Sequence, residues 1–222
     1  LWNQAYDQVS REKSHLVAGY EEILCDNFLI RNQAQQGGTA ITIAHEHNAR
    51  RHQMQQLVHQ GIQKAHTAHM LTEGLDNFFQ VTQFLKGVLD SAVQASPQAA
   101  LAWAGISVIL EVLQNPRKEM QSNREGIVYI AKRMEWYWDL ANLVLSNGDK
   151  GPEQHLRRKL ERNITDLYAA ILHYQMMSVC SYYRSRKREF FRSLVKRDDW
   201  EGTLQQIKDM EESFEKDLQQ FN

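Results

Sequence analysis

Apolar residues recur at steps of three and four along most of the chain, which is the spacing of amphipathic α-helices. The pattern predicts helices over residues 2–30, 45–72, 73–94, 97–113, 119–146, 153–188 and 198–222, with a short helix at 190–195. No stretch shows convincingly the two-residue alternation of a strand. We therefore expect an all-α fold, a single elongated bundle of about seven or eight helices.

Residues 97–113 differ from the other predicted helices because they are apolar on nearly every side. Ser96 and Pro97 form a helix start, in which a capping hydroxyl precedes a residue that needs no N–H donor. A helix that is apolar all round is surrounded by other helices, so we place this one at the centre of the bundle. The residues that we expect in the core are Trp103, Ile109, Met134, Trp138 and Tyr183.

Two polar segments interrupt the helical pattern. Residues 32–42 contain Gly37-Gly38 and predict a mobile loop, the internal stretch that we expect proteases to cut first. Residues 147–152 (NGDKGP) predict a second loop. Since 222 residues with 42% hydrophobic side chains can fill one core, we expect a single domain over residues 1–222.

Composition narrows the class of protein. The 11 Gly and 3 Pro are too few for the turns of a many-stranded sandwich or barrel. The two cysteines exclude a disulfide framework and fit a reducing compartment, so we expect a cytoplasmic protein. No apolar run approaches the ~20 residues of a membrane-spanning helix. The chain begins at Leu1 without a signal-peptide pattern, which we interpret as a domain of a longer protein.

Charge is distributed unevenly although the net charge is only −1. Residues 155–197 carry eleven Lys or Arg against three Asp or Glu, whereas residues 198–222 carry two Lys against eight acids. The favoured interpretation is that the acidic last helix packs along the basic long one. The alternative is a basic surface for nucleic acid or anionic lipid. Its densest part, RSRKR at 184–188, lacks the interleaved aromatic residues of a single-strand binder, so we expect no nucleic-acid partner.

The common catalytic motifs are missing. The chain has no GxxxxGK[ST] or GxGxxG phosphate loop, no GxSxG nucleophile elbow, no HExxH and no CxxC. We therefore expect no enzyme activity, no catalytic residues and no cofactor.

Histidines recur at seven-residue steps at His45, His52, His59 and His66, along the flank of the apolar stripe. The favoured interpretation is a polar helix edge. A shared metal ion is an alternative only for His66 with His69, or for His45 with Glu46 and His47, because residues seven apart are ~10.5 Å apart along a helix. A second alternative is a pH-sensitive contact surface that includes His52, His59 and His66.

The aromatic run at 136–138 divides between core and surface. Tyr137 and Trp138 fall on the apolar side of their predicted helix, whereas Trp136 points away from it. We therefore expect Trp136 at a groove or an interaction surface.

Several sequence blocks resemble the N-terminal domain of fungal NACHT-type NTPases, the NOD-like receptors of filamentous fungi. The blocks are LWNQAYD at 1–7, SPQAALAWAG at 96–105, NP at 115–116, NREGI at 123–127, RMEWYW at 133–138, SVCSYYR at 178–184 and DDW at 198–200. The resemblance covers most of residues 1–30 and nearly all of residues 53–222.

The resemblance implies a non-enzymatic effector or signalling domain that precedes a nucleotide-binding NACHT module. Receptors of this layout oligomerise on sensing a ligand and act in self/non-self recognition (heterokaryon incompatibility), innate immunity or programmed cell death. It implies association with the NACHT module, with further copies of the domain or with a downstream signalling protein. A membrane-active, pore-forming-like helical death effector is the alternative. Membrane contact is possible under it and is not favoured.

Overall fold

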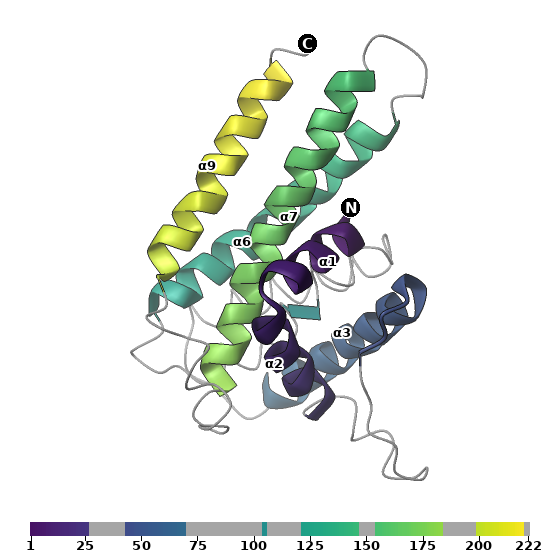
Figure 1. The fold of residues 1–222 in the computed structure, drawn as a ribbon. Helices are drawn as coiled ribbons and strands as arrows, with labels where there is room; N and C mark the ends of the chain where they lie inside the picture. Colours follow the sequence, from purple (N-terminus) through teal and green to yellow (C-terminus); the bar gives the residue numbers. More distant parts are fainter. Residues whose placement is uncertain (27–42, 70–103, 106–120, 147–153, 184–198, 220–222) are drawn as a thin grey trace.

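The computed structural model describes residues 1–26, 43–69, 104–105, 121–146, 154–183 and 199–219. Within these ranges there is no strand, and the labelled helices are α1 (Trp2–Glu12), α2 (Ser14–Leu24), α3 (His47–His69), α6 (Gln121–Ser146), α7 (Gln154–Tyr183) and α9 (Trp200–Gln219). The all-α class is confirmed (Figure 1). These six helices are fewer than the seven or eight expected over the whole chain. The expected helices at 73–94 and 190–195, the loops at 32–42 and 147–152, and all but two residues of 97–113 lie outside the described residues.

The long helix α7 is the axis of the fold. It contacts α1, α2, α6 and α9. Helices α6 and α7 run antiparallel, and α9 returns antiparallel to α7 (Figure 1). Near one end of the contact between α7 and α9, Lys159 Nζ lies 3.0 Å from Asp217 Oδ1. Towards the other end, the rings of Tyr174 and Trp200 meet edge to face, with centroids 5.4 Å apart. The acidic helix α9 therefore packs along the described part of the basic helix α7, as the charge pattern indicated.

The predicted helix over residues 2–30 is wrong in one respect, because the chain bends at Lys13. Its backbone leaves the helical region there, with φ −131° and ψ 45°, and α1 and α2 are separate helices of 11 residues each. Residues 10–15 (SREKSH) are all polar, so the apolar stripe loses one turn at this point. The bend lets the apolar faces on both sides of the gap reach α7.

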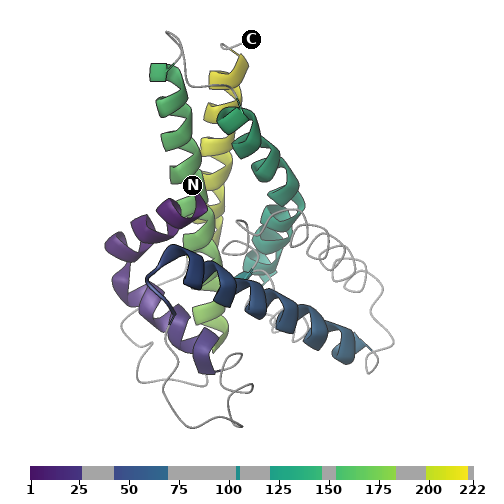
Figure 2. The same cartoon turned by 90° about the vertical axis from the view of Figure 1, so that its right-hand side faces the viewer.

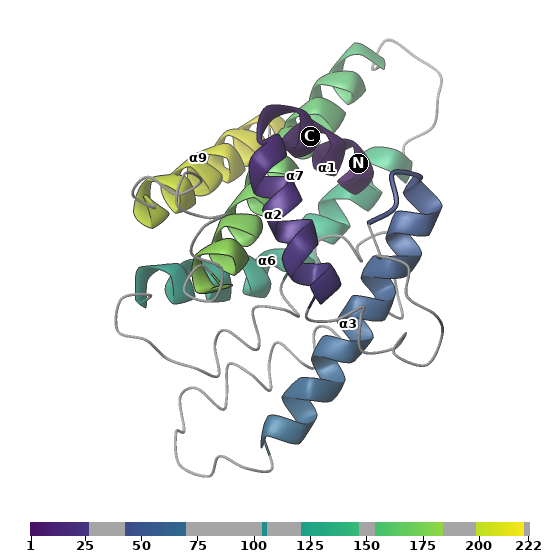
Figure 3. The same cartoon turned by 60° about the horizontal axis from the view of Figure 1, so that its bottom comes forward.

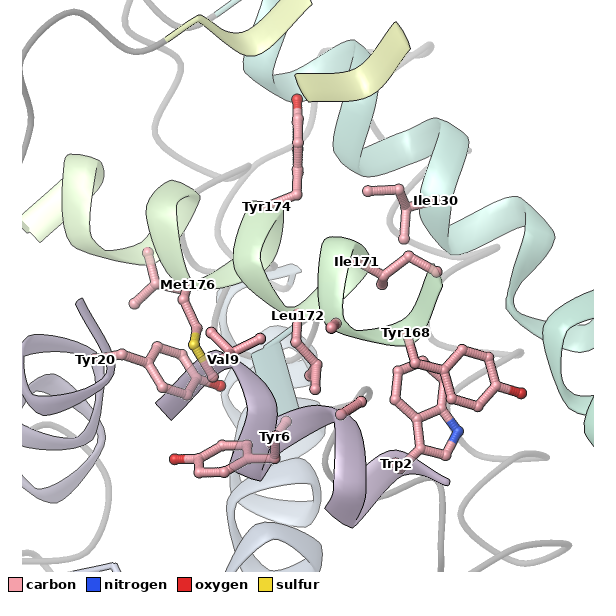
Figure 4. Close-up of a cluster of buried hydrophobic side chains, with 14 of the residues drawn as sticks. Trp2, Tyr6, Val9, Tyr20, Ile130, Tyr168, Ile171, Leu172, Tyr174 and Met176 are labelled. Carbon is pink, nitrogen blue, oxygen red and sulfur yellow. The ribbon is translucent and has the colours of Figure 1, made fainter. Parts of the chain in front are cut away.

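The core lies where α1 and α2 meet α7 (Figure 4). Trp2 stacks on Tyr168 with ring centroids 3.6 Å apart and planes 6° from parallel. The Tyr168 hydroxyl in turn donates to the backbone carbonyl of Tyr137 on α6. The other buried apolar side chains around α7 include Tyr6, Val9, Tyr20, Ile130, Ile171, Leu172 and Met176.

Helices α6 and α7 approach closely at Gly126. A Cβ built on this glycine would overlap the hydroxyl of Tyr174 and lie 2.6 Å from Tyr174 Cζ. The space is filled by polar contacts between the helices: the Tyr174 hydroxyl donates to the Asn123 carbonyl (3.2 Å), and Ser178 Oγ donates to Asn123 Oδ1 (2.6 Å). Because Gly126 has no side chain, it permits this close spacing of α6 and α7.

Only Ala104 and Gly105 are described from the predicted central helix. Both are helical and buried. A Cβ on Gly105 would meet the side chain of Gln175 on α7, with Cβ and Cδ both 3.1 Å away. Gly105 thus lies directly against α7.

Helix α3 lies on the opposite side of the molecule from α9 (Figures 1 and 2). It begins at His47, two residues later than predicted, because Glu46 caps it. The Glu46 carboxylate accepts the backbone N–H groups of Asn48 (2.9 Å) and Ala49 (2.7 Å). The part of α3 nearest its start buries Met54, Leu57 and Val58 completely, so this end is anchored. The rest of the helix extends away from α7 (Figure 2), and its far end lies apart from the other labelled helices (Figure 3).

Candidate functional site

A buried carboxylate joins α9 to α6. Glu211 of α9 is only 4% exposed, and three side chains of α6 converge on it: Tyr129, Arg133 and Tyr137. The Tyr137 hydroxyl donates to Oε1 and the Tyr129 hydroxyl to Oε2 (2.5 Å), while Arg133 Nε lies 3.1 Å from Oε2. Because the three residues follow one another at four-residue steps, they form a row along one side of α6. We call these four residues the Glu211 cluster.

Burial and the contacts with Glu211 fix the protonation of Tyr129, Arg133 and Tyr137. Burial and the hydrogen bond to Glu211 raise the pKa of Tyr137 far above its ordinary value, and the same two causes raise the pKa of Tyr129 to about 12. Burial disfavours the Arg133 cation, but the Glu211 carboxylate outweighs it and raises the pKa of the guanidinium. At neutral pH both phenols therefore act as donors and Arg133 is charged, so the cluster holds α9 on α6.

Trp136 lies at the edge of the Glu211 cluster and is partly buried. The Arg133 guanidinium sits 4.5 Å from the centroid of its indole ring. Its ring also meets Tyr137 edge to face, with centroids 5.3 Å apart. Arg133 continues outward to the exposed Glu215, with Nη2 3.4 Å from Oε1. The predicted interaction residue thus borders the polar contact between α6 and α9.

A second polar cluster joins α1 to the start of α3. Arg50 is 3% exposed, and its guanidinium lies 2.8 Å from Asp7 Oδ1 and donates to Asn3 Oδ1 (3.0 Å). Asp7 Oδ2 also lies 2.8 Å from His47 Nε2. Burial opposes ionisation of Asp7, but the hydrogen bonds from His47 and Arg50 outweigh it and hold the pKa of the carboxyl below its usual range. Arg50 also stacks over Tyr6 at 4.5 Å.

The predicted histidine edge is partly described. His45, His52 and His59 are exposed, and His45 precedes α3 instead of lying within it. The side chains of His66 and His69 lie outside the described residues, so their metal-site and interaction predictions stay predictions. Among the described side chains, no three His, Cys, Asp or Glu are grouped to hold a metal ion. The predicted interaction residues are divided between two helices, since the histidines belong to α3 and Trp136 to α6.

Of the predicted core residues, the structure describes the side chain of Tyr183, which is 2% exposed. Met134 and Trp138 lie within α6, but their side chains are outside the described part of the chain. Trp103 and Ile109 also fall outside it.

Comparison with known protein families identifies the family of this chain. A family model described as the N-terminal domain of NWD NACHT-NTPase matches residues 1–222. The chain belongs to this family. No curated protein and no solved structure gives a match. The resemblance found in the sequence blocks is therefore confirmed at the level of the family.

As a member of this family, the chain is the N-terminal domain of a NACHT NTPase. This domain is distinct from the NTPase module. The partner that membership implies is the NACHT module of the full-length protein. No helix in the described ranges of this NACHT N-terminal domain is both long enough and apolar enough to cross a bilayer.

Sequence reasoning missed the two buried charged residues, Arg50 and Glu211, that the described part of this NACHT N-terminal domain contains. Arg50 precedes Arg51 in a polar stretch, so nothing marks it as the buried one of the pair. Glu211 carries a detectable signal, because it occupies an otherwise apolar position in a regular three- and four-residue pattern along α9. A charge at such a position indicates a partner on the facing helix.

Proposed function

We propose that this NACHT N-terminal domain is a non-enzymatic effector or signalling domain of a fungal NOD-like receptor. It acts in the cytoplasm by helix-mediated protein association, in self/non-self recognition or programmed cell death. Family membership supports the receptor context. The buried charged side chains of the described interior support a structural role for the polar groups, since Arg50 and Glu211 each join two helices.

The observation that carries the association role is the partly buried Trp136 with a guanidinium over its ring. Trp and Arg are the residues most enriched at the centres of protein interfaces, where they lose most of their remaining contact with water. An indole already fixed by Arg133 and Tyr137 loses little conformational entropy when a partner covers it. Trp136 is therefore suited to bind a partner without rearrangement of α6.

Enforced association tests this function directly. The chain is expressed alone and fused to an unrelated hexamer, at equal and low cellular levels, and the signalling or cell-death output is measured. We expect the hexamer to be active and the isolated chain to be inactive, because the NACHT module would normally supply the effective concentration. Equal output from the two forms would refute the association role.

Liposome leakage distinguishes association from membrane attack. Neutral and anionic vesicles are loaded with a self-quenching dye and incubated with the isolated chain and with the hexamer fusion. The proposed function predicts no dye release from either vesicle type. Release at the concentration that produces cellular output would favour the membrane-active death effector instead.

A further inference from the structure

Helix α9 docks through a narrow seam with one polar position. The seam consists of Trp200, Leu204, Ile207, Glu211, Phe214 and Leu218, which follow at steps of 4, 3, 4, 3 and 4 residues. This is the repeat of a coiled-coil contact. Only Ile207, Glu211 and Phe214 of its 20 residues are buried, so α9 is held by few side chains and lies at the edge of the molecule (Figure 1).

Glu211 sets the register of this seam. If α9 moved by one heptad in either direction, Leu204 or Leu218 would face the row of Tyr129, Arg133 and Tyr137. The two phenols would then lose their hydrogen-bond acceptor and the guanidinium its opposite charge inside a helix interface, which is costly for buried polar groups. A single polar residue in an apolar seam fixes register and partner in this way. The α6 row is therefore selective for a helix with a carboxylate at the centre of its seam.

We propose that the face of α6 and α7 that holds α9 is also the docking site for α9 of a second copy of this chain. This inference rests on the proposed association function. An exchanged α9 makes every contact of the original one, including the Lys159–Asp217 pair at 3.0 Å, so the exchange needs no new surface. Fifteen residues separate Tyr183 from Asp199, a length of chain that reaches at most ~50 Å when extended.

The charge complementarity argues for a second copy as the occupant. Helix α9 carries Glu211 in the seam and Asp217 beside it, and the receiving helices present Arg133 and Lys159 to these two carboxylates. The exchanged pair buries the same carboxylate against the same two phenols, which an unrelated acidic helix of different seam spacing cannot do. Enforced assembly of several copies would raise the local concentration of α9 and so favour exchange.

Charge reversal on either side of the seam tests the exchange in the full chain. Glu211→Lys and Arg133→Glu each place like charges together, and we expect each variant alone to melt about 10 °C below the wild type. In a mixture, α9 of one variant meets α6 of the other, so both exchanged seams regain opposite charges. Co-expression with two different tags should therefore give a 1:1 heterodimer, measured by light scattering, with a melting temperature near the wild type.

The matched control reverses two exposed charges on the same helices, Glu212→Lys and Lys132→Glu, and should give no heterodimer. The double variant Glu211→Lys/Arg133→Glu in one chain reports whether the reversed pair is tolerated. If the double variant regains the melting temperature of the wild type but the two single variants form no heterodimer, the proposal is overturned. The hexamer fusion of the wild type stays an independent test, because its output depends on association and not on exchange.

A second measurement covers the case in which the reversed variants do not fold. Asp139→Cys and Ser213→Cys place labels at exposed positions of α6 and α9 with the seam unchanged. One copy carries the donor on α6 and the other the acceptor on α9. Exchange predicts the same transfer efficiency between copies as within a doubly labelled chain, and absence of transfer between copies in the hexamer fusion overturns it.

Discussion

The close approach of α6 and α7 makes Gly126→Ala a sensitive test of the fold. The new methyl group would overlap the hydroxyl of Tyr174 and lie 2.6 Å from its Cζ, well inside contact distance. Tyr174 is fully buried, and its ring is held edge to face against Trp200. The ring therefore has no free direction in which to move, and the two helices must separate or the ring must leave its place.

The expected loss of stability follows from three contributions. Overpacking of a buried site costs about 1–3 kcal/mol, and displacement of the Tyr174 hydroxyl from the Asn123 carbonyl costs about 1 kcal/mol more. The higher helix propensity of alanine offsets about 1 kcal/mol. We therefore expect the free energy of unfolding to fall by about 2 kcal/mol and the melting temperature by about 4–8 °C for a chain of this size.

Urea denaturation and calorimetry of the wild type and Gly126→Ala measure this difference in stability. A double-mutant cycle with Tyr174→Phe tests whether the difference arises from the contact between residues 126 and 174. Removal of the hydroxyl should cost about 1 kcal/mol in the wild type and less in the Gly126→Ala background, where it relieves part of the overlap. A stability gain of about 1 kcal/mol for Gly126→Ala, the value expected for an open helical position, would refute the packing of α6 on α7 described above.

Three further outcomes are expected. Trp136→Ala should lower the output of the hexamer fusion while the melting temperature drops by only a few degrees, since Trp136 is partly exposed; normal output at an unchanged melting temperature would exclude it as a contact residue. Asp7→Asn should be less stable than the wild type at neutral pH, and because the pKa of Asp7 is held below its ordinary 3.8, the gap in melting temperature should close as the pH falls below that value. A gap that persists in acid would contradict the ion pairs. Trp103→Ala should cost on the order of 3–5 kcal/mol if the apolar helix is central; a loss below about 1 kcal/mol would place that helix at the periphery.

The helices that the sequence predicted best are those with an uninterrupted apolar stripe. Periodicity alone placed α6 and α9 to within two or three residues at each end. The break at Lys13 was missed because the stripes of α1 and α2 have the same phase, and only the missing turn at residues 10–15 separates them. Such a gap can mark a polar turn of one helix or a bend, and contact with α7 decides between the two.

The polar clusters depend on tertiary neighbours that a local pattern does not contain. The four-residue row on α6 and the acidic seam position on α9 are each visible in the sequence, but their pairing joins residues 74–82 positions apart. Arg50 contacts Asn3 and Asp7 of α1, which precede it by more than 40 residues. The sequence therefore predicted an interaction role for Trp136, but it did not predict the Glu211 cluster that Trp136 borders.

The dependence of output on concentration tests the association role most directly. Signal per molecule of the isolated chain is measured in cells over a wide range of expression levels, from high dilution upward. Association predicts a signal per molecule that is near zero at high dilution and rises with concentration towards that of the hexamer fusion. A constant signal per molecule down to the highest dilution would contradict the account and would indicate that single copies of the chain are active on their own.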